Sequence, residues 1–311
     1  MKHILKYLPL VFSLSLILIA CKKEKEAATQ IVTDTEVATH YDDESMVSEE
    51  LDAIADEANS LLESDPILSG NNSVVEEVIC DASIAINADS DPMTLTVTFN
   101  GANCGTKRTR TGVMVLSMPK GTEWKNEGAE ITVHFENMKV TRTKDGKSIT
   151  FNGTKVYKNV SGGLIHEAAQ SGTIVHTITS NDLTIKFDDG TARSWNVARK
   201  KEFSYNNGLV ISVSGIHEVG ENSGIAEWGT NRFGNAFVTT IKSPLVVKQD
   251  CSFRLTGGVI EHSTDVFVAT ATFGLDASGA STSCPGTGKF YYKLGWTKIS
   301  NGNNFSVLLP Y

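Results

Sequence analysis

The sequence predicts a mostly β protein: one large, curled antiparallel sheet, arranged as a meander, with a single amphipathic helix near the N-terminus. Apolar and polar residues alternate from about residue 73 to the C-terminus, which is typical of half-buried strands. The connections between these runs are short, and short connections favour antiparallel pairing because parallel strands need long crossovers. Glycine also recurs inside the runs, which indicates bulges or bends. It does so in Val97–Gly101 (VTFNG), Ile149–Asn159 (ITFNGTKVYKN), Ile211–Gly215 (ISVSG) and Phe253–Gly257 (FRLTG).

These runs predict about fourteen strands, and a sheet of that width should curl rather than stay flat. The expected strands are Val74–Ile86, Thr94–Asn100, Arg108–Met118, Ala129–Arg142, Ser148–Asn159, Gly172–Thr179, Leu183–Phe187, Ser194–Arg199, Leu209–Gly215, Asn235–Ile241, Cys251–Ile260, Asp265–Leu275, Phe290–Thr297 and Asn304–Leu309. The apolar parity changes near Glu136-Asn137, which predicts a bulge there. Since residues 73–311 contain no linker rich in Pro or Ser, we expect a single β domain, with a split near Ser243-Pro244 as the alternative.

Residues 1–20 have the pattern of a lipoprotein signal peptide. Lys2 and Lys6 precede an apolar core, Tyr7–Ile19, that is too short to span a membrane as a helix. The core ends in Leu18-Ile19-Ala20-Cys21, which resembles the lipobox of bacterial lipoproteins. That resemblance implies cleavage before Cys21, a diacylglyceryl thioether on its sulfur, and an acyl chain such as palmitate on the new N-terminus. Several acyl chains make a stable membrane anchor. The alternative is an ordinary secretory peptide with a chance cysteine.

The segment after Cys21 is strongly acidic. Between Lys22 and Pro66 there are 14 acidic residues and 3 lysines, whereas residues 67–311 carry 22 acids and 23 bases. We expect residues 21–43 to be a solvated tether. Residues 44–66 should form an amphipathic helix, because Leu51, Ile54, Ala58, Leu61 and Leu62 share one helical face. The helix should dock on the sheet. A position on the membrane surface is the alternative, but it would favour Lys or Arg on the polar face.

Four cysteines remain after Cys21, an even number in an exported chain, which favours two disulfides. A turn at Ala88–Met93 should bring Cys80 opposite Cys104. A second turn, near His262–Thr264, should place Cys251 beside the loop that holds Cys284. A metal site is the alternative, but the CxxC and CxxH spacings are absent, so we expect no metal.

The sequence contains no catalytic motif that we recognise, so we expect neither an enzyme nor a cofactor. The seven histidines lack metal-binding spacing. A basic group could bind nucleic acid, but the β region is nearly neutral overall, which argues against that role. This group consists of Arg199-Lys200-Lys201 with Lys107, Arg108 and Arg110. The four tryptophans could stack on sugars if exposed, although packing in the sheet is their commoner fate. They are Trp124, Trp195, Trp228 and Trp296.

Several segments together resemble a group of uncharacterised outer-membrane lipoproteins from Bacteroidota-type bacteria. They are the lipobox, the acidic helix, Arg108–Met118, Ala129–Gly162, Asp189–Phe203 and Ser243–Gly258. The resemblance implies a fold and a location, and it supplies no catalytic or binding residue. Lys22 after the lipidated cysteine also resembles the outer-membrane sorting pattern.

We therefore expect a non-enzymatic binding or carrier lipoprotein, anchored in the outer membrane through Cys21 and facing the periplasm or the cell surface. Its ligand-binding residues are not identifiable from the sequence. A structural or assembly component of the envelope, in contact with another protein, is the alternative. A protein or a glycan is the expected class of partner.

Overall fold

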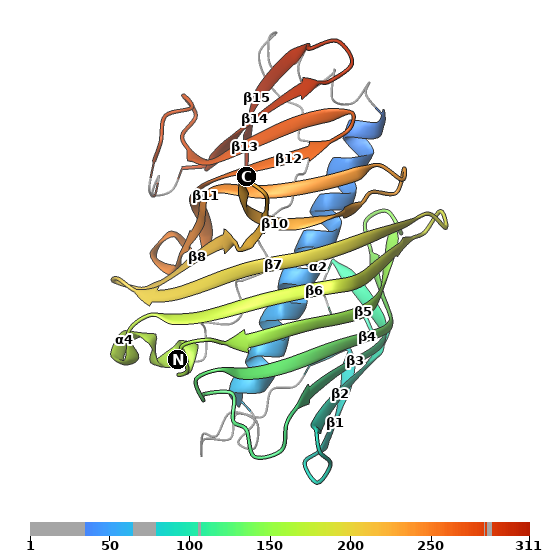
Figure 1. The fold of residues 1–311 in the computed structure, drawn as a ribbon, viewed down its shortest axis with the longest axis vertical. Helices are drawn as coiled ribbons and strands as arrows, with labels where there is room; N and C mark the ends of the chain where they lie inside the picture. The colour runs from blue at the N-terminus through green and yellow to red at the C-terminus, as the bar shows by residue number, and fades with distance from the viewer. Residues whose placement is uncertain (1–34, 65–78, 105–106, 283, 285–287) are drawn as a thin grey trace. The chain divides into compact units, whose positions relative to one another are not determined.

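The computed structural model describes residues 35–64, 79–104, 107–282, 284 and 288–311. The predicted signal peptide, Cys21 and residues 22–34 of the predicted tether lie outside these described residues. The described part is mostly β and contains one long helix, α2 (Thr35–Ser64), so the predicted fold class is confirmed (Figure 1). Within the described residues, no helix combines the length and the apolar character needed to cross a membrane.

The described residues divide into two compact units, and the prediction of one β domain stays a prediction. The first, here called the β1–β7 unit, contains residues 229–234 and the described residues of 54–204. The second, called the β8–β15 unit, contains the described residues of 35–53, 205–228 and 235–311. The chain passes between the units four times: within α2 at Ala53/Ile54, inside strands at Ser204/Tyr205 and Trp228/Gly229, and in a connection at Gly234/Asn235. No linker marks these points, and Ser243-Pro244 lies within strand β11 (Ala236–Lys248).

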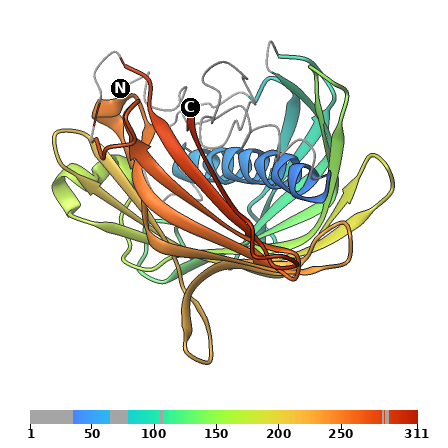
Figure 2. The same ribbon diagram turned by 90° about the horizontal axis from the view of Figure 1, so that it is seen from above.

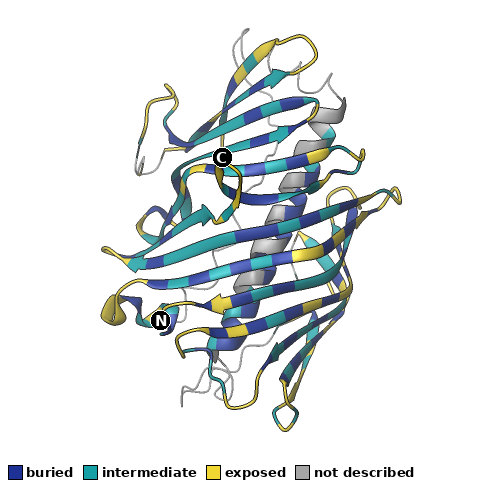
Figure 3. Cartoon of the chain, viewed as in Figure 1, coloured by how far each residue is buried: buried dark blue, intermediate teal, exposed yellow. Residues whose placement is uncertain are grey.

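In the β1–β7 unit, seven strands form an antiparallel meander in which each strand pairs with the next. The strands are β1 (Ala82–Asn87), β2 (Met93–Asn100), β3 (Arg108–Met118), β4 (Ala129–Arg142), β5 (Ser148–Asn159), β6 (Ile174–Phe187) and β7 (Ala192–Tyr205). Two short helices, η2 (Ile165–Glu167) and α4 (Ala168–Ser171), lie between β5 and β6. Burial alternates along the strands, as Figure 3 shows, so one face of the sheet carries the core.

The bulge predicted near Glu136-Asn137 is present. The register of β4 against β5 shifts between Phe135 and Met138, and Asn137 has a left-handed backbone with φ 47°. The extra residue restores the inward direction of the apolar side chains after the bulge. A different outcome holds for the two separate strands that the sequence predicted at Gly172–Thr179 and Leu183–Phe187. They belong to one continuous strand, β6, whose register against β7 shifts between Ser180 and Leu183.

The β8–β15 unit is also antiparallel. β10 to β15 follow one another in the sheet, β8 pairs with β11, and β9 pairs with β10. The strands are β8 (Leu209–Gly215), β9 (His217–Val219), β10 (Asn222–Thr230), β11, β12 (Arg254–Thr264), β13 (Phe267–Leu275), β14 (Tyr291–Lys298) and β15 (Asn304–Pro310), with the short helix η3 (Gln249–Cys251) after β11. β9 and β10 were missed by the sequence analysis.

Helix α2 begins before the predicted helix, so residues 35–43, expected in the tether, are helical. Its C-terminal part belongs to the β1–β7 unit and lies on one side of those strands (Figure 2). Four residues of the predicted apolar stripe are buried there, namely Ile54, Ala58, Leu61 and Leu62. The side chain of Leu51, the fifth residue of the stripe, is not among those that the structure describes. Burial of this stripe supplies most of the helix's stability, since isolated helices are marginal in water.

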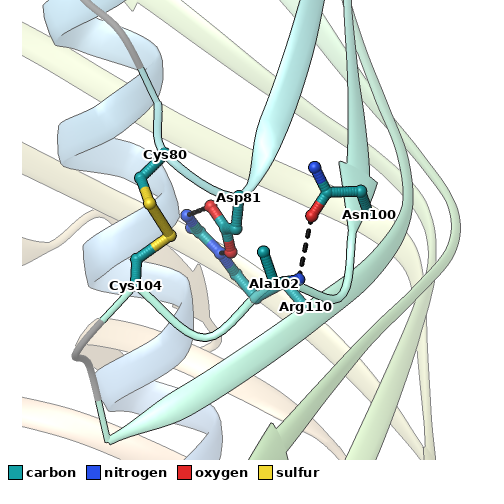
Figure 4. The surroundings of a disulfide bond; sticks show 6 residues. All are labelled: Cys80, Asp81, Asn100, Ala102, Cys104 and Arg110. Atoms are coloured by element: carbon teal, nitrogen blue, oxygen red, sulfur yellow. Dashed lines mark hydrogen bonds and ion pairs between the residues drawn. A yellow bond between two sulfur atoms is a disulfide. The ribbon is translucent and has the colours of Figure 1, made fainter.

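Both predicted cysteine pairs lie at the distance of a disulfide bond. Cys80 pairs with Cys104 at a Cα–Cα distance of 6.0 Å, and Cys251 pairs with Cys284 at 5.7 Å. The first disulfide closes the start of β1 against the segment after β2, where Asp81 and Arg110 lie beside it (Figure 4). Each unit therefore contains one disulfide.

Candidate functional site

The tryptophans are mainly structural. Trp124, Trp195 and Trp296 are buried in the core, so their rings offer no exposed platform for a sugar. Trp228 is half-buried on β10, and its ring stacks on His217 of β9 with 3.9 Å between ring centroids. That stack already covers one face of the indole.

One group of possible metal ligands occurs among the described residues: Asp250, Cys251 and Cys284, whose ligand atoms lie within 4.8 Å of one another. The two sulfurs are joined in a disulfide, and a metal ion binds cysteine as the free thiolate. The group therefore gives no reason to assign a metal site.

Arg110, one of the residues considered for a basic group, forms a buried ion-pair network with the helix. Its Nε and Nη2 donate to the two carboxylate oxygens of Asp81 at 2.8 and 2.6 Å, and its Nη1 donates to Glu57 of α2 at 2.5 Å. Burial opposes the charge, but the hydrogen bonds to Asp81 and Glu57 outweigh it and raise the pKa of Arg110. The network ties α2 to β3 and to the segment held by the Cys80–Cys104 disulfide.

A second polar contact holds the C-terminal end of α2. Glu63 accepts a hydrogen bond from the backbone N–H of Ile165 at 2.8 Å, and its other oxygen lies 3.2 Å from Nδ1 of His166. The hydrogen bond to Glu63 raises the pKa of His166. The connection between β5 and β6 is therefore attached to the end of the helix.

Near this end of the helix, three side chains from distant parts of the sequence meet in the β1–β7 unit; we call them the Trp124–Asn159–His176 cluster. Asn159 ends β5 and is the register partner of His176 on β6. The Nδ2 of Asn159 donates to the backbone oxygen of Trp124 at 2.9 Å and to that of Gly163 at 2.8 Å. The His176 ring lies between those of Trp124 and Phe203, with centroids 5.0 and 5.1 Å away.

The cluster contains three buried polar atoms that have no hydrogen-bond partner among the described residues: Trp124 Nε1, Asn159 Oδ1 and His176 Nε2. The three residues are only 1%, 0% and 6% exposed. Buried polar atoms in native proteins are nearly always satisfied by protein, water or a ligand, because an unpaired one costs about 1–3 kcal/mol. Three such atoms in one cluster mark it as a candidate site for a water molecule or a ligand.

Electrostatics keep this cluster uncharged. Burial lowers the pKa of His176 to about 4, so its ring is neutral at neutral pH. Glu63 raises this pKa and Lys201, the register partner of His176 on β7, lowers it. A neutral imidazole, an indole N–H and an amide oxygen can hold a ligand by hydrogen bonds, but they are poorly suited to moving protons near neutral pH.

The sequence pattern indicates Trp124 and His176 only as single residues and gives no prediction for Asn159. A usable signal did exist in the alternation of buried and exposed residues along β5 and β6. Asn159 lies two positions from Tyr157, and His176 lies two positions from Ile178, so both occupy inward-facing positions where an apolar residue is expected. Their convergence depends on strand register, which the pattern alone does not fix. No family model, curated protein or solved structure matches this chain, and the resemblance to outer-membrane lipoproteins stays a prediction.

Proposed function

We propose that this protein is a non-enzymatic binding or carrier lipoprotein of the outer membrane, anchored through Cys21, and that it binds its ligand at the Trp124–Asn159–His176 cluster. The observation that carries the binding role is the set of three buried polar atoms that lack partners in the described structure. The lipobox-like sequence before Cys21 supports the anchor.

The end of α2 lies close enough to control access to this cluster. Glu63 acts electrostatically on His176 and is bonded to Ile165, which follows the Gly163-Leu164 segment next to Asn159. The side chain of His166 is 47% exposed, so its contact with Glu63 is a surface ion pair, and such pairs are individually weak. Local opening of the Glu63 contact would let a ligand reach the cluster without unfolding the sheet.

The anchor is tested with Cys21→Ala. The variant lacks the thiol that carries the lipid, so it should move from the membrane fraction to the soluble fraction and fail to incorporate labelled palmitate. Ala20→Gly keeps a small residue before the cysteine and serves as the control, which should stay in the membrane. Unchanged membrane retention of Cys21→Ala would contradict the anchor.

The binding role is tested by native mass spectrometry of the protein purified from its membrane. The wild type should carry a bound small molecule at a clearly higher occupancy than His176→Phe, since phenylalanine keeps the ring but removes Nε2. His134→Gln is the matched control, because His134 is exposed on β4, where it contacts Thr154. Equal occupancy of the bound molecule in the wild type and His176→Phe would contradict the site.

An assembly role is the second candidate, and the hairpin formed by β9 and β10 favours it. Ile216 and Val219 are 39% and 57% exposed at this hairpin. Exposed apolar side chains that lie together often mark a protein interface. If this role is correct, the wild type should migrate in native gels as part of a larger membrane complex. The double variant Ile216→Ser, Val219→Ser should be released from that complex. A wild type that migrates alone would contradict the assembly role.

A further inference from the structure

We infer that the Trp124–Asn159–His176 cluster binds the uncharged, hydroxyl-bearing head group of a membrane amphiphile, of the monoacylglycerol type. This inference rests on the proposed binding function and adds the chemical class of the ligand. Three properties of the cluster lead to it: its hydrogen-bonding pattern, its charge balance and its apolar surroundings.

The hydrogen-bonding pattern requires a ligand group that both accepts and donates. Trp124 Nε1–H can only donate, so it needs an acceptor. The orientation of Asn159 is fixed, because its Nδ2 already donates to two backbone oxygens, and its free Oδ1 therefore needs a donor. His176 Nε2 can take either role as its tautomer changes. A hydroxyl group satisfies this combination, whereas a carboxylate can only accept and an ammonium can only donate.

The charge balance also favours an uncharged group. The carboxylate of Glu63 and the ammonium of Lys201 both interact electrostatically with His176. An anion bound at the cluster would be attracted by Lys201 but repelled by Glu63, and a cation would be attracted by Glu63 but repelled by Lys201, so these two charges favour neither sign. In addition, the cluster is almost completely buried, and transfer of an ion into such a site is costly.

The surroundings of the polar atoms are apolar, which suits the hydrocarbon part of the ligand. Phe203 packs against His176, and Ile174 and Ile178 flank it on the same face of β6. All three are buried. A hydroxyl group attached to an alkyl chain matches this combination better than a free sugar, which is polar on most sides.

The test compares three probes of equal chain length below their micellar concentrations: 1-octanoylglycerol, octanoate and octylamine. The full chain is kept in solution by an amphiphilic polymer without detergent, and binding is measured by calorimetry. We expect 1-octanoylglycerol to bind at least about tenfold more tightly than either charged probe. His176→Phe and Trp124→Phe should each weaken it roughly five- to tenfold, the effect of one lost hydrogen bond.

The controls separate this inference from the proposed function. His134→Gln should bind 1-octanoylglycerol like the wild type, and Trp124→Phe provides a second variant if His176→Phe folds poorly. If octanoate or octylamine binds best and both variants weaken it, the site is correct but the head-group class is wrong. If no probe binds and a crystal structure shows only an ordered water on the three atoms, the inference is overturned. Binding of 1-octanoylglycerol that neither variant changes would overturn it as well.

Discussion

Gly112 shows how one residue permits the bend of a strand pair. It lies on β3 opposite the bulge of β4, with φ +104°, and a Cβ there would meet the backbone oxygen of Asn137 at 2.3 Å. Gly112→Ala should therefore lower the free energy of unfolding by more than about 2 kcal/mol, because it combines a backbone strain with a clash against main-chain atoms. Chemical denaturation measures this change.

The matched control for this prediction is Gly146→Ala. Gly146 also has a positive φ, +74°, but nothing lies within 4 Å of the added Cβ. Only the backbone strain applies there, at about 1–2 kcal/mol. Equal losses in the two variants would show that the close approach of β3 and β4 is not important for stability.

His176 should make the protein less stable in acid. The folded state binds this proton only near pH 4, whereas the unfolded state binds it near the ordinary pKa of 6.5. This difference in pKa therefore leaves the free energy of unfolding unchanged above about pH 6.5. As the pH falls from 6.5 towards 4, the free energy of unfolding should decrease by roughly 3 kcal/mol. His176→Phe removes the proton site, so the stability difference between variant and wild type should grow in the variant's favour over this range. Denaturation curves at pH 7.5, 5.5 and 4.5 that give a constant difference would contradict this account.

At the scale of elements, the stability of the β1–β7 unit should depend on Arg110 more than on Glu57. Arg110→Gln leaves the carboxylate of Asp81 buried without its counter-charge, which costs about 3 kcal/mol or more. Glu57→Gln should cost less than about 1 kcal/mol, since the side chain of Glu57 is 26% exposed and Arg110 keeps Asp81. Chemical denaturation gives both values, and proteolysis within α2 reports its detachment. A larger loss in Glu57→Gln would reverse the assignment of the main contact.

The elements also show which sequence patterns were informative. The strands of the β1–β7 unit keep strict alternation, so most of them and the bulge in β4 could be predicted. β10 could not, because Asn222–Thr230 contains two glycines and a buried glutamate, Glu227, that interrupt the alternation. Residues 35–43 of α2 are mostly polar, and the one among them that is described as buried is an aspartate, Asp43. Their sequence therefore gives no apolar stripe from which a helix could be predicted.

At the scale of the whole molecule, the two disulfides should stabilise the two units separately. They join residues 24 and 33 positions apart, and closing loops of this length should contribute about 3.5 kcal/mol each. Replacing both cysteines of one pair by serine should therefore raise hydrogen exchange mainly in one unit. Cys80→Ser with Cys104→Ser should affect the β1–β7 unit, and Cys251→Ser with Cys284→Ser should affect the β8–β15 unit. An equal rise in both units from either pair would show that the chain unfolds as one cooperative body.

The sequence by itself determined the properties that depend on neighbouring residues: the alternation of the strands, the helical stripe of α2, the turns that bring the cysteines together and the lipobox-like pattern that ends at Cys21. Only the tertiary structure decided what lies together across the sheet. Trp124, Asn159 and His176 meet because of the register between β5 and β6 and the course of the connection from β3 to β4. Glu57 reaches Arg110, 53 positions away, because α2 packs on the strands. Alternation fixes the face on which a side chain lies, but its neighbours on that face are set by register shifts and packing, which involve residues far apart in the chain.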